Sequence, residues 1–229
     1  GAIQLRTVRP RSGLDARVSV TGGAFGQRGS SLLLGGALSD DTSVLAAVDY
    51  QATDGDFPYL DESRFPPATV RRRNADRTRR TAYASVRSEV GAHQLRVSGW
   101  LTRAERGLPP TSSTGAAQER QWDHQLRLWG RDRVPVGNGR LTVQALAQRT
   151  RLRYANPSRD LDQTGQTDLA SLETTLRHPL SSHWTMAGGL SGSAARARHP
   201  RLAAAARQEH VSAFLDATAS YGRLALYPA

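Results

Sequence analysis

The sequence predicts an all-β protein, built as one antiparallel meander of about ten to eleven strands. The first reason is a period of two: in residues 44–51 the even positions are apolar or aromatic, whereas the odd positions include Asp49 and Gln51. Such alternation places the two sets on opposite faces of a strand. The second reason is that the pattern recurs along the chain with no helical stretch between. The third is the way in which the connections are sorted by length.

Three strands come first, each with apolar residues at every second position. They are expected over residues 14–24, 30–38 and 42–53. Glycine and polar residues at 26–29 and 39–41 mark tight turns between them. A long segment from about residue 54 to 77 follows. Its three prolines (Pro58, Pro66 and Pro67) and its charges exclude a central strand there.

The same rhythm continues through the rest of the chain. Strands are expected over residues 80–90, 94–103, 121–134, 140–153, 168–178, 184–196 and 210–220, with a partial strand at about 223–229. Gly91 and the Gly137-Asn138-Gly139 run mark tight hairpins, because Gly and Asn accept positive φ. Residues 181–183 mark another turn. Long connections are expected at about 105–119, 154–165 and 199–207.

The expected connections are sorted by parity. Those after the second, fourth, sixth, eighth and tenth strands are short, and those after the third, fifth, seventh and ninth are long. Only the first connection breaks the rule. Outer-membrane barrels have short turns at one end and long loops at the other, whereas a soluble sandwich has no reason to sort its loops. The pattern favours a transmembrane β-barrel wall.

The composition agrees with this fold. Hydrophobic residues make up 38% of the 229, aromatics 6%, and the mean hydropathy is −0.52. A barrel needs no dense hydrophobic interior, because its lumen is polar. No run approaches the 18 or so apolar residues of a transmembrane helix. There is no cysteine, which excludes disulfides and thiolate metal sites. The net charge of +11 allows anionic partners.

Period-two geometry assigns side chains to faces. Twelve residues are expected on one lipid-facing side: Val18, Val20, Val44, Val48, Leu95, Val97, Leu126, Leu128, Val143, Leu172, Val211 and Leu215. Seven polar residues are lumen-facing candidates: Asp49, Gln51, Arg96, Asp123, Arg127, Gln144 and Glu173. Tyr50, Trp122 and Trp184 fit either an interfacial aromatic belt or ordinary strand packing.

No catalytic group of residues stands out, so the protein is not expected to be an enzyme. The six histidines show no metal-ligand spacing, and adjacent Asp123 and His124 point to opposite faces of a strand. Carboxylates gather at Asp54, Asp56, Asp61 and Glu62, but their spacing matches no dedicated calcium loop. No cofactor and no metal site are therefore predicted.

Gly1–Thr7 (Gly-Ala-Ile-Gln-Leu-Arg-Thr) resembles the last strand of the plug domain in one family, the TonB-dependent outer-membrane receptors of the cobalamin and siderophore type. Gly22–Gly26 resembles the first hairpin of that family. Asp54–Tyr59, Arg73–Asp76 and Arg106–Pro109 are similar to its loop and strand sequences. The resemblance spans nearly the whole chain, and each of its motifs is short.

The resemblance implies a plug inside a barrel of about 22 strands. Residues 1–13 would be the end of the plug and a linker, and residues 14–229 the N-terminal half of the barrel. It implies TonB-dependent uptake of a metal chelate across the bacterial outer membrane, with TonB acting through the plug. Lipid and lipopolysaccharide would surround the wall. The candidate ligand-binding residues in the first long loop are Asp54, Asp56, Tyr59, Arg72 and Arg73.

Two other functions stay open beside this one. A passive porin or adhesin-like barrel would lack the plug segment at Gly1–Thr7. A soluble basic β-protein binding nucleic acid would gather arginine and aromatic residues on one face, whereas here the arginines scatter, so no nucleic-acid partner is expected. The alternating segment that begins at Leu224 stops at Ala229, and no signal peptide opens the chain, which predicts a fragment with open sheet edges.

Overall fold

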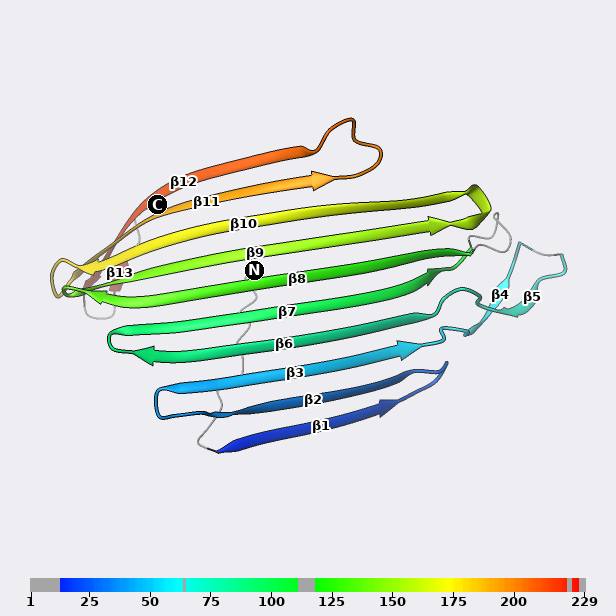
Figure 1. Cartoon of the computed structure of the whole chain (residues 1–229), viewed down its shortest axis with the longest axis horizontal. Helices are drawn as coiled ribbons and strands as arrows, with labels where there is room; N and C mark the ends of the chain where they lie inside the picture. Colours follow the sequence, from blue (N-terminus) through cyan, green and yellow to red (C-terminus); the bar gives the residue numbers. More distant parts are fainter. Residues whose placement is uncertain (1–12, 64, 111–117, 222–223, 227–229) are drawn as a thin grey trace.

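The protein is a single large β-sheet, seen in a computed structural model that describes residues 13–63, 65–110, 118–221 and 224–226. Eleven strands pair antiparallel, each with its neighbours along the chain (Figure 1). In the described part of the chain the one helical element is a 3₁₀ turn, η1 (Pro157–Arg159), and no helix is long and apolar enough to cross a membrane. The predicted antiparallel meander is confirmed.

The eleven strands follow the chain in order. They are β1 (Leu14–Gly22), β2 (Arg28–Ala37), β3 (Thr42–Thr53), β6 (Arg77–Val90), β7 (His93–Leu108), β8 (Glu119–Val136), β9 (Gly139–Asn156), β10 (Leu161–Pro179), β11 (Trp184–Arg198), β12 (Ala206–Tyr221) and β13 (Leu224–Leu226). A separate hairpin of β4 (Pro58–Asp61) and β5 (Ala68–Arg71) projects between β3 and β6. The prolines thus exclude a central strand, as predicted, but not a small outlying one.

The connections differ at the two ends of the sheet. At one end, here the turn end, the described connections cover residues 38–41, 91–92, 137–138 and 180–183. At the other, the loop end, they run between the strand ends at residues 23–27, 54–76, 109–118, 157–160 and 199–205. At the turn end, Gly137 has φ of +57°, which the two-residue hairpin requires. The predicted sorting of connections is confirmed at these four turns and at three of the four predicted long loops, and the turn predicted after the tenth strand lies outside the described residues.

The predicted long loop at residues 154–165 is wrong. Strand β9 continues to Asn156 and β10 begins at Leu161, so only residues 157–160 connect them. The hydrophobic period fades there because β10 begins with polar residues on both faces, Asp162 and Thr164 on one and Gln163 on the other, while the backbone ladder continues. An Arg153 to Asp162 hydrogen bond of 2.9 Å links the two strands in this extension.

Each ladder keeps one register across the described strands, which fixes the two faces of the sheet. Residues directly opposite each other in a ladder lie on the same face. One such row runs from Val44 through Val86 and Val97 to Leu172 and Val211. All twelve residues expected to share a face do so in these registers.

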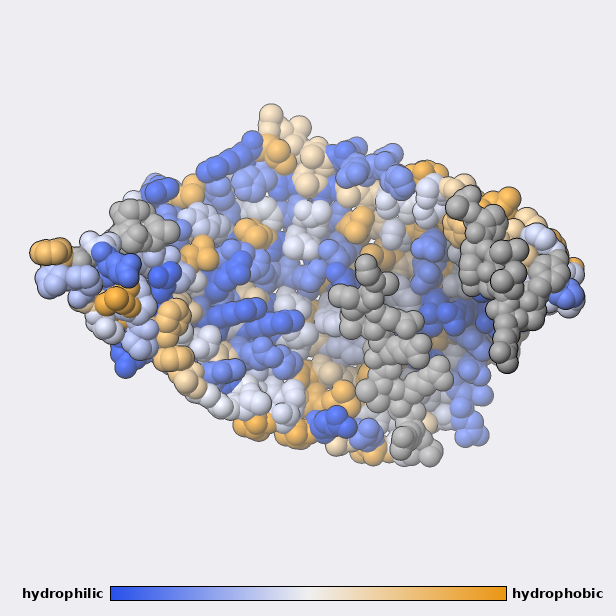
Figure 2. Space-filling model, turned by 180° about the vertical axis from the view of Figure 1, so that it is seen from behind, coloured by the Kyte–Doolittle hydropathy of each residue, from blue (hydrophilic) through white to orange (hydrophobic). Residues whose placement is uncertain are grey.

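The sheet curls, so it has a convex and a concave face (Figures 1 and 2). Figure 2 shows hydrophilic side chains over much of the hollowed, concave side. The middle of the convex face carries an apolar band, formed by Val18, Leu32, Leu34, Val44, Val48, Val86, Leu95, Val97, Leu101, Leu126, Leu128, Leu141, Val143, Leu172, Leu176, Leu190, Val211 and Leu215.

The described chain has almost no core of its own. Only four apolar residues in that part are buried, and none is larger than leucine: Leu45, Ala52, Ala187 and Ala219. On the apolar band, by contrast, Val211 is 82% exposed and Leu215 is 75% exposed. A contiguous apolar surface of this kind marks a face that meets lipid or another apolar surface. Strands β1 and β13 end the sheet, and no described ladder joins them.

Candidate functional site

The concave face holds every lumen-facing candidate predicted from the sequence. Asp49 and Gln51 lie on β3, Arg96 on β7, Asp123 and Arg127 on β8, Gln144 on β9 and Glu173 on β10. The registers place all seven opposite to the apolar band. Gln144 lies directly across from Glu173. Their role in lining a channel remains a prediction.

Arginines dominate one part of the concave face. Arg87, Arg96 and Arg131 stand directly opposite one another on three successive strands. The Arg96 and Arg131 guanidinium carbons lie 5.7 and 5.4 Å from the centre of the Trp129 ring. Cation–π contacts of this kind help to hold neighbouring cations on one aromatic side chain. This part of the wall presents positive charge to whatever occupies the concave side.

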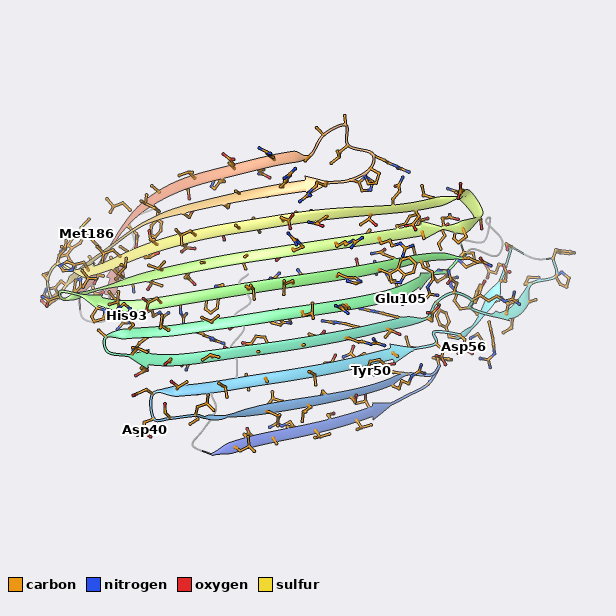
Figure 3. The ribbon with its side chains drawn as sticks, viewed as in Figure 1. Asp40, Tyr50, Asp56, His93, Glu105 and Met186 are labelled. Carbon is orange, nitrogen blue, oxygen red and sulfur yellow. The ribbon has the colours of Figure 1, made fainter. Side chains whose placement is uncertain are left out.

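The β4–β5 hairpin gathers several of the loop candidates at the loop end (Figure 3). Asp56 accepts a 2.7 Å hydrogen bond from Arg71, a pairing that sequence reasoning did not identify. The Arg72 guanidinium carbon lies 5.3 Å from the centre of the Tyr59 ring. Asp54 instead lies at the base of the loop, 3.4 Å from Arg28, and Arg73 is exposed.

A polar cluster missed by the sequence analysis fixes the base of the loops. The Asn74 side-chain amide donates to the carbonyl oxygens of Leu108 and Glu119, both at 2.8 Å. A Cβ added at Gly107 would come within 2.5 Å of the Asn74 backbone oxygen, so glycine is needed at this close approach. The sequence contains no short-range pattern that predicts this cluster, because Asn74 lies 34 residues from Leu108 and 45 residues from Glu119.

Charged groups beside this cluster extend it across β7 and β8. Arg120 lies 2.7 Å from Asp76 and 2.8 Å from Glu105. On the concave side the Glu119 carboxylate accepts hydrogen bonds from the Tyr154 hydroxyl at 2.7 Å and the Asn156 amide at 2.8 Å. The bond to Glu119 raises the pKa of Tyr154, so that the hydroxyl stays protonated and keeps donating.

The convex face changes character toward the loop end, where an arginine belt follows the apolar band. The belt consists of Arg80, Arg103, Arg120, Arg149, Arg151, Arg153, Arg196, Arg198 and Arg207. Four carboxylates share these convex-face positions: Glu105, Asp162, Asp168 and Glu209. Arginines thus outnumber carboxylates by nine to four, and the belt carries net positive charge.

The three aromatic residues left open by the sequence lie at the borders of the apolar band. At the loop end, the Arg80 guanidinium carbon lies 5.9 Å from the centre of the Tyr50 ring, which Figure 3 labels. The Arg153 guanidinium carbon lies 4.8 Å from the centre of the Trp122 ring, which also belongs to the loop-end half of its strand. Trp184 begins β11 at the turn end and is 44% exposed. Placement at both borders of an apolar band fits interfacial aromatic residues. Over the described residues, no three acidic, His or Cys side chains gather in a metal-binding group.

Comparison with known proteins identifies the fold but not a sequence family. No protein-family model matches the chain, and no curated protein matches it. Among solved structures, FpvA of P. aeruginosa bound to heterologous pyoverdines has a TM-score of 0.52 at 12% identity, with 96% of this chain and 42% of FpvA covered.

This chain also matches two further solved structures, and the matches cover similar shares of the two chains. The copper transporter OprC has a TM-score of 0.48 at 10% identity, over 95% of this chain and 44% of OprC. The ferric yersiniabactin uptake receptor FyuA from Yersinia pestis has 0.45 at 11%, over 93% and 44%. The chain therefore spans less than half the length of these proteins.

Of these three structures FpvA has a TM-score above 0.5, so the fold assignment rests on that comparison. The chain shares the fold of 42% of FpvA, and the resemblance to TonB-dependent receptors predicted from the sequence is confirmed as a resemblance of fold.

Proposed function

We propose that residues 14–229 form the N-terminal half of the barrel wall of a TonB-dependent outer-membrane receptor that takes up a metal chelate. The amphipathic sheet carries this proposal: its convex apolar band is exposed, while its concave face is polar. An outer-membrane barrel needs this arrangement, with lipid outside and water or a plug inside. Residues 1–13 would be the end of the plug and a linker, and residues 1–12 lie outside the described part.

The proposed route for the chelate begins at the loop end. The β4–β5 hairpin, with Asp56, Tyr59 and Arg72, supplies charged and aromatic groups that suit capture of a siderophore or a cobalamin. The seven concave-face candidates would line the passage and contact the plug. TonB would supply energy through the plug. The pyoverdine–iron complex named for FpvA supports the metal-chelate class, without fixing the ligand of this protein.

A passive porin or adhesin-like barrel without a plug is the alternative. It needs the same amphipathic wall, so the fold supports both. Single-channel recording of the whole gene product separates them: a plugged receptor should show no large, steady conductance, whereas a porin should. Uptake assays with ferric siderophores and cobalamin should then lose their signal in cells that lack TonB.

Because the sequence contains no cysteine, introduced cysteines can test which end of the sheet faces the outside of the cell. Single cysteines are introduced into the gene product at Leu60, in the β4–β5 hairpin, and at Asn138, in a two-residue turn. In intact cells, a membrane-impermeant maleimide should label Leu60→Cys, whereas Asn138→Cys should react only after the outer membrane is permeabilised. Equal labelling of both sites, or absence of the protein from the outer-membrane fraction, would contradict the proposal.

A further inference from the structure

A groove of about 520 Å³ lies where the apolar band meets the arginine belt, on β8 to β12. Its floor consists of three alanines directly opposite one another: Ala147, Ala170 and Ala194. Leu126 and Leu128 border it on β8. Small side chains in the middle of a row of larger ones leave a shallow apolar channel on the convex surface.

Charged residues form the loop-end rim of this groove. The next row contains Arg149, Asp168, Arg196 and Arg207, each directly opposite the following one. Asp168 is already engaged, by Arg149 at 2.5 Å and by Arg198 at 3.2 Å. Glu209 lies one position further along the convex side of β12, opposite Ala194.

Arg196 and Arg207 are left as an exposed pair of like charges. Within the described part of the chain, neither forms an ion pair or a side-chain hydrogen bond. Like charges directly opposite each other on neighbouring strands are destabilising. A bound anion would remove that repulsion, and two guanidinium groups match a phosphate in both charge and geometry.

We propose that this groove is a lipid A site, in which a phosphate binds Arg196 and Arg207 and an acyl chain lies over the alanine floor. The inference rests on the proposed function, since it needs the loop end to face the outer leaflet. A soluble anion would make no use of the apolar channel. The turn end offers a different border, with the His93–Asp132 pair at 2.7 Å in place of two unpaired arginines.

The test uses the whole gene product, purified from outer membranes in a nonionic detergent. Binding of fluorescent bisphosphorylated lipid A in mixed micelles is followed by anisotropy. Arg196→Gln combined with Arg207→Gln should weaken binding about tenfold, since charge-assisted contacts to phosphate are lost. Ala170→Leu should also weaken it, by filling the floor without changing any charge.

The matched control is Arg140→Gln combined with Arg177→Gln. These arginines also stand directly opposite each other, but on the concave face, so the double variant removes the same charge and should leave binding unchanged. Equal loss in both double variants, no loss in either, or equally tight binding of dephosphorylated lipid A would overturn the inference. Heat-modifiable mobility on gels shows that each variant is folded. Cysteine labelling reports membrane orientation separately, so the two proposals can fail independently.

Discussion

The apolar band and the arginine belt lie on the same face of the same strands, yet they are stabilised differently. On β10, Leu172 and Leu176 belong to the band, whereas Asp162 and Asp168 lie in the belt. Side chains in the band present apolar surface to their surroundings, while those in the belt pair with one another across the strands. Backbone pairing continues unchanged from one region to the other. The kind of side chain on the convex face therefore changes with position along the strand, from apolar to charged, while the strand itself continues.

A charge placed in the band should cost far more than the same charge in the belt. Val86 and Thr78 both lie on the convex side of β6, opposite Val97 and Glu105 respectively. Val86→Arg should destabilise the bilayer-embedded gene product by about 2–4 kcal/mol, and Thr78→Arg by about 0–1 kcal/mol. Denaturant unfolding in lipid vesicles measures the free energy of unfolding of each variant. A similar loss in the two variants would show that the band does not lie at the membrane centre.

Removal of the Asn74 amide should be the most costly polar change at the loop end. Asn74→Ala leaves the Leu108 and Glu119 carbonyls without their donor, at a cost of about 1–3 kcal/mol. Asn138→Ala, in an exposed turn at the other end, is the control and should change the unfolding midpoint little. Equal shifts in the two variants would mean that Asn74 does not hold the loop bases together.

The ion pairs of the belt should contribute less to the free energy of unfolding than the Asn74 hydrogen bonds do. Arg120 and Asp76 have side chains 31% and 43% exposed, so water screens their attraction. Asp76→Asn should destabilise the protein by less than about 1 kcal/mol in low salt, and by less still in high salt. A salt-independent loss of several kcal/mol would show that the pair is more strongly shielded from solvent than its exposure indicates.

The smallest effect should be a pH dependence confined to the belt. The hydrogen bond from Arg153 holds the pKa of Asp162 below its ordinary value of 3.8. Because the pKa is lowered in the folded state, the pair stabilises the fold above that ordinary value and is lost as pH falls through the lower one. An NMR titration of the Asp162 carboxyl should show a lowered midpoint that rises in Arg153→Gln. An unchanged midpoint would contradict this.

The sequence predicted the faces well because a period of two is a local property. Val44 and Asp49 differ in parity, and no bulge among the described strands shifts that parity. Strand existence was therefore correct wherever apolar residues alternated. The start of β10 at Leu161 was missed because polar residues occupy both of its faces there, so that the hydrophobic signal disappears but the ladder does not.

The candidate site was harder to predict, since its contacts join distant parts of the chain. Arg71 and Asp56 are hydrogen-bonded because β4 and β5 form a hairpin, and their separation of 15 residues in the sequence does not predict the pair. The opposition of Arg196 and Arg207 follows from the register of β11 with β12. Sequence parity places Arg196 on the convex side, but Arg207 falls in the connection expected at 199–207, because the start of β12 at Ala206 was not predicted.

The meander also bears on how such a sheet is made. Every strand of the eleven-stranded sheet pairs only with the strands that precede and follow it in that sheet, and only the β4–β5 hairpin interrupts this order, between β3 and β6. Local contacts close short loops and lower the entropic barrier to folding. A growing sheet can therefore add one hairpin at a time, with its latest strand as the template for the next. Assembly in this order leaves unpaired backbone groups at only two edges, the fixed outer side of β1 and the strand added last.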